Sequence, residues 1–281
     1  MAGNTPESTP DATDTDSAGR LAGEGLVLQY PGTDEPVVDG ESLVAEPGAV
    51  TALVGPNGSG KSTLLKGLAE QMTPVDGTVR LDGRAVHAME TKELARKLGL
   101  LSQESTSPDT ITVEDLVYHG RYPHRAFFER VTDADREAVE RAIDRAGCGH
   151  LRERAVGSLS GGQKQLAWIA MVLAQETDVL LLDEPTTFLD LHHQLEVMEI
   201  IETLNADSSI TVVVVLHDVE QAARLADRMV ALEGGEIRAH GTPEAVVTED
   251  LLRSVFDIEA RVEVTDRGPL VDPIRPYHGD Q

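Results

Sequence analysis

The stretch that decides the fold is a glycine-rich run that follows the apolar segment 49–54. It reads Gly55-Pro56-Asn57-Gly58-Ser59-Gly60-Lys61-Ser62-Thr63. Glycines let a loop curl so that successive backbone N–H groups point at one anion, and a helix that begins there adds its positive dipole end. The run fits the phosphate-loop pattern in full. It therefore predicts a nucleotide-phosphate site, in which Lys61 reaches the phosphates and the Ser62 hydroxyl binds Mg²⁺.

A second pattern places two carboxylates at the end of a buried strand. The apolar residues 179–182 are followed by Asp183 and Glu184. Ligands of open α/β sheets bind beyond the carboxyl ends of the strands. We therefore expect Asp183 to hold Mg²⁺ through its water shell. Glu184 would be the general base that activates a water molecule, an effect of about 10²–10⁴ in rate. Adjacent acids are common on protein surfaces, and only the phosphate loop makes this pattern specific.

Strands and helices alternate along most of the chain, which predicts an α/β fold with a mainly parallel sheet covered by helices. The predicted strands are 25–30, 49–54, 77–83, 179–182 and 210–216. The predicted helices are 61–71, 113–120, 133–146, 162–175, 191–204 and 218–226. Residues 229–240 are predicted to form a hairpin that turns on Gly234 and Gly235.

The composition changes along the chain and divides it into parts. Residues 1–20 are rich in Thr, Ser, Pro and Asp without apolar periodicity, so we expect a disordered acidic tail. Residues 21–245 are predicted to form the main domain, with a helical lobe at about 91–160. Residues 246–281 would be a C-terminal extension, with a short helix at 251–258 and a loose proline-rich end.

The bulk composition excludes several classes of protein. Of the 281 residues 40% are hydrophobic, enough for a sizeable core. The longest apolar runs are too short to cross a bilayer, and the N-terminus lacks the pattern of a secretory signal. We therefore expect a soluble intracellular protein. The single cysteine, Cys148, excludes an internal disulfide and a cysteine-cluster metal site.

The charge of the chain is strongly acidic. There are 24 Lys and Arg residues against 49 Asp and Glu residues, a net charge of −25. Such a surface repels nucleic-acid phosphates, so we expect no DNA or RNA partner. Self-repulsion is tolerable in molar salt, where the Debye length is about 3 Å. We therefore hypothesise a halophilic source; the alternative is an ordinary acidic cytosolic protein.

A third motif narrows the class. Leu159-Ser160-Gly161-Gly162-Gln163 precedes a predicted helix and is similar to the signature sequence of ATP-binding-cassette (ABC) proteins. With the first two motifs, the chain resembles the nucleotide-binding subunit of an ABC transporter over about residues 25–245. The resemblance implies the P-loop NTPase ABC-cassette fold, in which an antiparallel β part and a helical subdomain accompany the parallel sheet. It also implies hydrolysis of ATP with Mg²⁺.

The signature also implies a partner. Ser160 and the two glycines would form a second anion-binding helix N-terminus. In the family, this element closes over the γ-phosphate held by the other subunit. A chain with one phosphate loop and one signature would therefore pair head-to-tail with a second copy of itself.

Four further residues match positions of the family. Gln103 matches the glutamine that contacts Mg²⁺ and the attacking water, and His217 matches the histidine that contacts the γ-phosphate. Asp190 matches the aspartate that links the two sites across the dimer. Tyr30 matches the aromatic residue that stacks on adenine, although a tyrosine at a strand end is usually a core residue. An isolated histidine would be structural more often than not; the position of His217 after strand 212–216 favours the functional role.

The surrounding sequence favours a transporter subunit. The chain has one cassette and no membrane helix, which implies docking on a separate permease at the cytoplasmic face of the membrane. An external substrate-binding protein would be an indirect partner. The segments 119–124 and 182–194 resemble importer ATPases for iron(III)-siderophores, haem and cobalamin. The neighbours His192 and His193 cannot face one ligand as an i,i+4 pair would, so we interpret them as surface or loop packing rather than a metal site.

Two alternatives stay open on the sequence alone. One is a soluble ABC ATPase that acts as an assembly or regulatory factor without a permease. The other is a nucleotide-binding scaffold that does not hydrolyse ATP, which the presence of every catalytic position disfavours.

Overall fold

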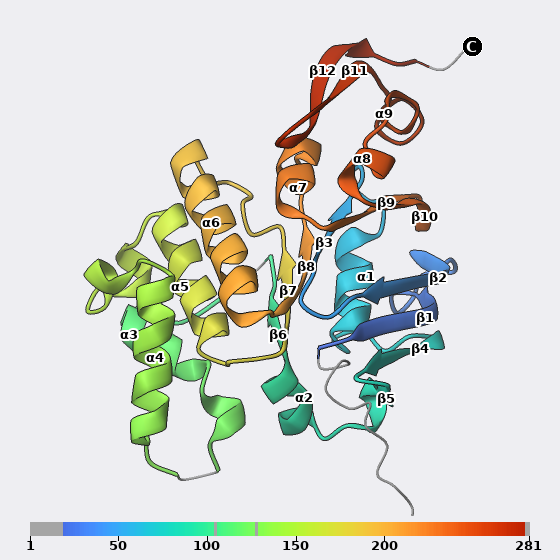
Figure 1. The fold of residues 1–281 in the computed structure, drawn as a ribbon. Coiled ribbons are helices and arrows are strands. Elements are labelled where there is room, and N and C mark those ends of the chain that lie inside the picture. The colour runs from blue at the N-terminus through green and yellow to red at the C-terminus, as the bar shows by residue number, and fades with distance from the viewer. Residues whose placement is uncertain (1–18, 104–105, 127–128, 279–281) are drawn as a thin grey trace, which may run out of the picture.

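Two sheets and a C-terminal hairpin organise the protein (Figure 1). The structure is a computed structural model that describes residues 19–103, 106–126 and 129–278. Almost all of the predicted acidic tail, residues 1–20, lies outside the described residues. No helix in the described part of the chain is long and apolar enough to span a bilayer.

A six-stranded sheet forms the centre, in the order β10-β9-β3-β8-β7-β6. All neighbours are parallel except β9 and β10, which form the predicted hairpin. The strands are β3 (Val50–Val54), β6 (Leu98–Leu101), β7 (Val179–Asp183), β8 (Thr211–Val215), β9 (Arg228–Glu233) and β10 (Glu236–Gly241). This sheet confirms the predicted α/β class.

The central strands are buried on both faces, as their continuous apolar runs predict. Every residue of β3, β7 and β8 is buried. Along β8, Val212 and Val214 belong to one hydrophobic core, while Val213 and Val215 belong to the other. The sheet therefore separates two cores, and its strand ends are held rigidly where the motifs follow them.

The second sheet is antiparallel and covers helix α1 (Lys61–Leu68) from the far side (Figure 1). Its order is β2-β1-β4-β5. The strands are β1 (Leu21–Leu28), β2 (Val38–Ala45), β4 (Asp76–Leu81) and β5 (Arg84–Ala85). Helix α1 contacts β1 on one side and β7 and β8 on the other. It is thus fixed between the two sheets.

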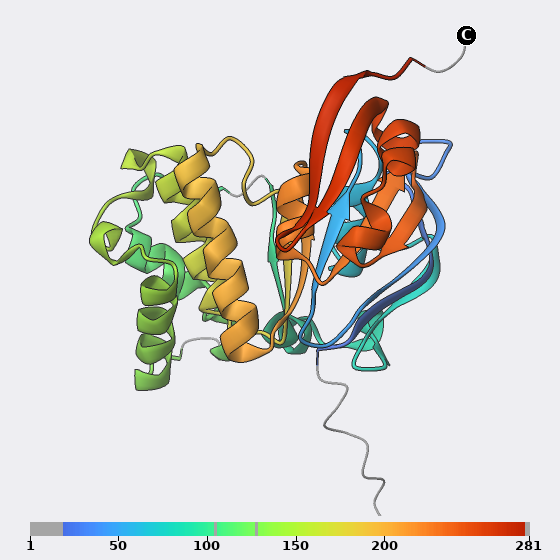
Figure 2. The same cartoon turned by 45° about the horizontal axis from the view of Figure 1, so that its top comes forward.

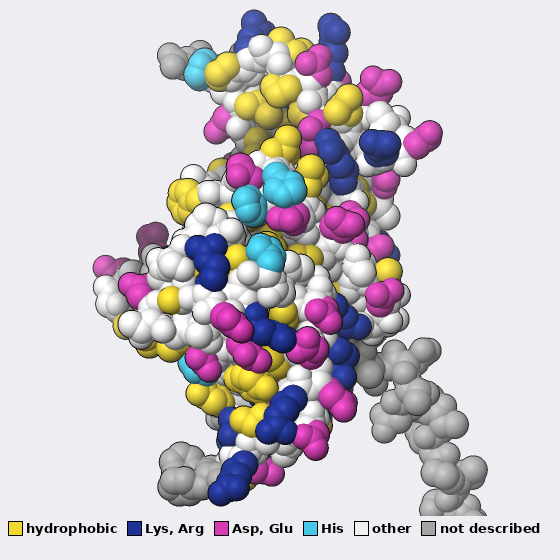
Figure 3. All heavy atoms as spheres, turned by 90° about the vertical axis from the view of Figure 1, so that its left-hand side faces the viewer, with side chains coloured by type: hydrophobic (Ala, Val, Ile, Leu, Met, Phe, Trp, Pro, Cys, Tyr) yellow, Lys and Arg dark blue, Asp and Glu magenta, His cyan; other side chains and the backbone are white. Residues whose placement is uncertain are grey.

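Most of the other helices lie beyond the opposite face of the central sheet, and α3, α4, α5 and α6 form a group on one side (Figures 1 and 2). Helix α2 is the exception, because its Leu94 packs against the same core as α1. The helices are α2 (Thr91–Lys97), α3 (Val113–His119), α4 (Asp133–Arg145), α5 (Gly161–Leu173), α6 (Leu191–Ser208) and α7 (Val219–Leu225). Short 3-10 turns are η1 (Val86–Ala88), η2 (Tyr122–His124), η3 (Gly149–Leu151) and η4 (Val156–Ser158). Acidic side chains are spread among basic ones over the outer surface of this group (Figure 3).

Three strands of the sheets were missed from the sequence. β2 and the two-residue β5 were not predicted, and β6 fell inside the stretch predicted as helical from about residue 91. In the structure Leu98 pairs with Val179 and Leu101 with Leu182, so β6 belongs to the central sheet. A four-residue apolar run is too short to show a period and follows helix α2 directly, which explains the error.

The prediction of a loose proline-rich end was wrong. Strands β11 (Ile258–Thr265) and β12 (Gly268–Pro276) form an antiparallel hairpin beside α7 (Figure 2). A two-stranded hairpin has only edge strands, and proline is tolerated on edges. Before it lie α8 (Pro243–Val246) and α9 (Glu249–Phe256), the latter close to the short helix predicted at 251–258. The backbone N–H of Val271 donates to Glu220 Oε1 on α7 at 2.6 Å, which fastens the hairpin to that helix.

Candidate nucleotide-binding and hydrolysis site

The phosphate loop joins the end of β3 to the start of α1, as the sequence predicts. Gly55 has φ +148°, and a Cβ added there would lie 2.1 Å from the carbonyl oxygen of Leu232. Gly60 caps the helix in the left-handed region, at φ +99°. Both positions therefore exclude larger residues. The loop borders a cleft of about 360 Å³ whose lining includes Tyr30, Lys61 and Glu184.

Lys61 lies at the base of this loop and is only 4% exposed. Its Nζ donates to the carbonyl oxygens of Gly55 and Pro56, both at 2.8 Å. Burial lowers the pKa of Lys61, while the charges of Glu184 and Asp183 act in the opposite direction. Burial deprives the Lys61 ammonium group of hydrating water. A negatively charged phosphate group that enters the cleft would therefore stabilise its charge strongly.

Ser62, which lines the cleft, is joined to the buried Asp183. Ser62 Oγ donates to Asp183 Oδ1 at 2.8 Å. Burial raises the pKa of Asp183, the neighbouring charge of Glu184 raises it further, and the Ser62 hydrogen bond opposes both. A hydroxyl and a carboxylate are hard oxygen donors of the kind Mg²⁺ takes beside phosphate oxygens and water. Among the described residues no group of three or more His, Cys, Asp or Glu could hold a metal, so an all-protein cage is not formed there. The donor set fits an ion that shares its ligands with a nucleotide.

Glu184 has the most constrained environment of the site. Its side chain is 9% exposed, and its backbone has φ +52°, a region that non-glycine residues rarely adopt. Gln103 Nε2 donates to Glu184 Oε2 at 2.7 Å, and His217 Nε2 lies 2.7 Å from Glu184 Oε1. Gln103 follows β6, Glu184 follows β7 and His217 follows β8. Three neighbouring strands therefore deliver one carboxylate with two orienting partners.

Tyr30 lies at the edge of the same cleft. It follows β1, is 38% exposed, and its hydroxyl is 3.3 Å from Thr63 Oγ1. The exposed ring beside the phosphate loop suits the predicted stacking on adenine better than a core role.

The signature residues are placed elsewhere. Ser160 caps α5 and exchanges hydrogen bonds with Gln163, which forms a capping box. Of the described residues that line the phosphate-loop cleft, none belongs to the signature. Asp190 caps α6 and lies beside the signature rather than beside the phosphate loop, because its neighbour His193 packs on Gly162. The structure thus brings the predicted residues together in two groups, not one.

Two contacts of the site were not predicted as such. Thr187 Oγ1 donates to Glu184 Oε2 at 3.1 Å and adds a third hydrogen bond to the carboxylate. His193 Nδ1 lies 2.8 Å from Asp190 Oδ1 while its ring faces Gly162. Thr187 follows Glu184 at the i+3 spacing that lets a side chain reach back, which is the signal that could have identified it.

A strand, a glycine loop and a helix, with Asp183 and Glu184 at the end of β7, two strands along the sheet from β3, define a P-loop nucleoside triphosphatase. The family model of ABC transporters matches residues 38–187. The chain therefore belongs to the ABC transporter family, and it is an ATP-hydrolysing cassette.

Three similar proteins place the chain within this family. The ferric enterobactin transport ATP-binding protein FepC of Escherichia coli is 45% identical over 92% of this chain and 96% of its own length. A chain from a structure described as an ABC transporter of the metal-chelate type, in an inward-facing conformation, gives a TM-score of 0.78 at 27% identity, over 92% of this chain and 98% of that one. A dimeric bacterial ABC transporter cassette gives a TM-score of 0.71 at 26% identity, over 79% and 98%.

Proposed function

We propose that this chain is the ATPase subunit that powers import of an iron(III)-siderophore through a separate permease. The similarity to a ferric enterobactin transport protein along nearly the whole of both chains supports the cargo class. The similarity to a metal-chelate type ABC transporter supports a metal-chelate cargo. The chain would lie at the cytoplasmic face of the membrane, held there by the permease, with an external substrate-binding protein as an indirect partner.

The observation that supports hydrolysis most directly is the triangle of Gln103, Glu184 and His217. A carboxylate held by Gln103, His217 and Thr187 at the edge of the phosphate-loop cleft can accept a proton from an attacking water. His217 and Gln103 fix the direction of that carboxylate, and Lys61 balances the charge of the phosphates. Mg²⁺, held by Ser62, Asp183 and the Gln103 amide oxygen, would supply charge neutralisation of the phosphate oxygens.

The separation of the two groups of residues supports the second copy. None of Ser160, Gly161, Gly162 and Asp190 lines the chain's own cleft, and they would meet the nucleotide of another copy. The capped N-terminus of α5 offers free N–H groups and a positive dipole end to that nucleotide's γ-phosphate. The dimeric cassette with the same fold supports this arrangement.

The test is uptake of labelled ferric siderophore and of labelled cobalamin by cells that carry the intact chain or its Glu184→Gln variant. A matched control is Glu202→Gln, because Glu202 is exposed on α6, away from both groups. We expect Glu184→Gln to abolish ferric siderophore uptake, with cobalamin uptake and the control unchanged. Loss of cobalamin uptake alone would reassign the cargo.

The competing function is that of a soluble assembly factor without a permease. If salt-washed membranes retain the chain only when an integral partner is present, the importer holds. If the chain never sediments with membranes and both uptakes survive Glu184→Gln, the soluble factor takes its place.

A further inference from the structure

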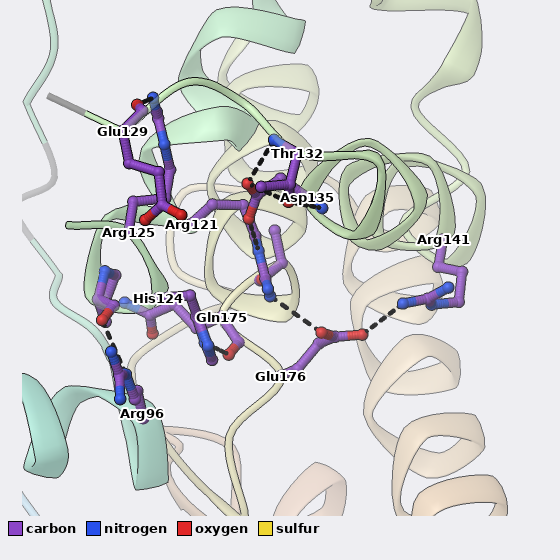
Figure 4. Close-up of polar contacts among 12 residues, drawn as sticks. Arg96, Arg121, His124, Arg125, Glu129, Thr132, Asp135, Arg141, Gln175 and Glu176 are labelled. Atoms are coloured by element: carbon purple, nitrogen blue, oxygen red, sulfur yellow. Dashed lines mark hydrogen bonds and ion pairs between the residues drawn. The ribbon is translucent and has the colours of Figure 1, made fainter.

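An arginine is buried in the segment that follows α3. Arg121 is 5% exposed, and its buried acidic partner, Asp135 on α4, is 3% exposed. Arg121 Nε donates to Asp135 Oδ1 at 3.1 Å, while Nη1 donates to the carbonyl oxygen of Ala174 at 2.7 Å and to Glu176 Oε2 at 2.9 Å (Figure 4). One guanidinium therefore joins three elements: the end of α3, the start of α4, and the residues after α5.

The contacts of the same segment with α5 are close on both sides of Arg121. A Cβ added to Gly120 would lie 2.1 Å from the carbonyl oxygen of Met171, so only glycine fits there. His124 Nε2 lies 2.7 Å from the carbonyl oxygen of Gln175 (Figure 4). The segment 120–124 is thus fixed to the C-terminal end of α5. The N-terminal end of that helix begins at the Ser160 cap, about 20 Å away along a rigid helix.

The other side of the segment is held by α2. Arg96 Nε donates to the carbonyl oxygen of Pro123 at 2.8 Å, and Lys92 Nζ donates to that of Arg125 at 2.8 Å. Helix α2 leads directly into β6, whose end is followed by Gln103. The segment therefore contacts two helices, each connected to one group of site residues. Helix α5 begins at the signature, and α2 leads through β6 to Gln103.

The segment also presents a free surface. Tyr122 is 56% exposed, and its ring stacks on that of His119 with centroids 4.9 Å apart. An exposed tyrosine on a short 3-10 turn, stacked on a half-buried histidine at the end of α3, suits contact with another protein. On the inner side of the same turn, Arg121 is hydrogen-bonded to the residues after α5. A displacement of the turn would therefore be passed on to α5.

We infer that Arg121 is a positioning residue that locks the segment 120–125 to the end of α5, so that a displacement of this segment by an integral membrane partner moves the signature end of α5. This inference rests on the proposed function. Replacing a buried ion pair with apolar groups is often neutral for stability, so stability alone does not explain a buried arginine. The planar guanidinium can hold a carboxylate, a carbonyl and a second carboxylate at fixed angles, which lysine cannot.

The test uses a variant in which both buried charges are removed together. Arg121→Met alone would leave Asp135 buried and unpaired, and the protein could fail to fold. The double variant Arg121→Met with Asp135→Asn avoids this, because asparagine still accepts the capping hydrogen bonds that Thr132 donates to residue 135. The matched control is Arg141→Met, since Arg141 also binds Glu176 but lies on the exposed side of α4 and does not touch the segment.

The measurement is ATP hydrolysis by the purified chain, alone and with inverted membrane vesicles from source cells that lack their own copy of it. We expect kcat and KM without vesicles to stay within about twofold of the wild type in both variants. Stimulation by vesicles should fall about three- to tenfold in the double variant only. A merely structural role would change the thermal midpoint and leave the stimulation unaltered.

The outcomes separate the inference from the proposed function. Equal stimulation of the wild type and the folded double variant overturns the inference and leaves the importer intact. An equal loss of stimulation in Arg141→Met also overturns it. Absence of any stimulation in the wild type overturns the proposed function, and the inference with it.

Discussion

Replacement of Gly162 by alanine tests the contact between the signature and the residues that follow Asp190. A Cβ at this position would lie 2.4 Å from both Cγ and Cδ2 of His193. Carbon atoms pack at about 3.5–4.0 Å, so the imidazole must retreat by about 1 Å. Its hydrogen bond to Asp190 would then be lost. Gly161→Ala is the matched control, because a Cβ there meets nothing within 4 Å.

The magnitude follows from two contributions. Crowding in a packed contact costs about 1–3 kcal/mol. The reduced freedom of the unfolded chain returns about 0.4–1 kcal/mol in both alanine variants. We therefore expect the free energy of unfolding of Gly162→Ala to lie about 1–3 kcal/mol below that of Gly161→Ala. Gly161→Ala should leave it unchanged or raise it by about 0.4–1 kcal/mol.

The assay is urea unfolding of the nucleotide-free chain, followed by circular dichroism. His193→Ala removes the ring, so Gly162→Ala added to it should cost little, a coupling of about 1–3 kcal/mol between the two positions. If the two substitutions are additive, or if Gly162→Ala is as stable as Gly161→Ala, the packing of His193 on the signature is refuted.

Three further predictions concern pH, metal and salt. Burial acts to raise the pKa of Asp135, but hydrogen bonds from Thr132 and Arg121 outweigh it and hold the pKa below 3.8. The decrease in the free energy of unfolding caused by Asp135→Asn should therefore be constant at pH values well above 3.8. It should vanish as the pH falls through the lower pKa of Asp135 in the folded state, which urea unfolding at stepwise pH will show. Ser62→Ala should raise the Mg²⁺ concentration needed for binding of a fluorescent ATP analogue about tenfold or more; an unaltered Mg²⁺ titration would remove Ser62 from the metal site. With a net charge of −25, the thermal midpoint should rise from 0.1 M to multimolar KCl, and a midpoint independent of salt would contradict the halophile hypothesis.

The sequence predicted the phosphate loop and the paired carboxylates well because both are local patterns. The loop from Gly55 to Lys61 needs only its own glycines and the elements beside it, and β7 needs only a run of apolar residues. The meeting of Gln103, Glu184 and His217 is different, because it depends on the order β6-β7-β8 in the sheet. Only the family resemblance, and no residue pattern, placed these three side chains at one site.

The features that were missed have no periodic signal. β6 is four residues long, and the hairpin of β11 and β12 contains prolines that usually argue against a strand. Arginine is almost never fully buried unless it is paired, and the partners of Arg121 come from residues 135 and 174–176. A single sequence cannot show that pairing, because it is created by the packing of α3, α4 and α5.

The most direct test of the account is hydrolysis by a mixture of two inactive variants. Glu184→Gln removes the general base, and Ser160→Arg blocks the signature. If a complete site combines Glu184 of one copy with the signature of another, each variant alone is inactive. Random pairing of equal amounts then leaves one complete site in half of the dimers, about a quarter of all sites. We predict that single-turnover ATP hydrolysis recovers to about a quarter of the wild-type amplitude on mixing. No recovery on mixing would contradict the shared site. So would hydrolysis by Ser160→Arg alone at the wild-type amplitude.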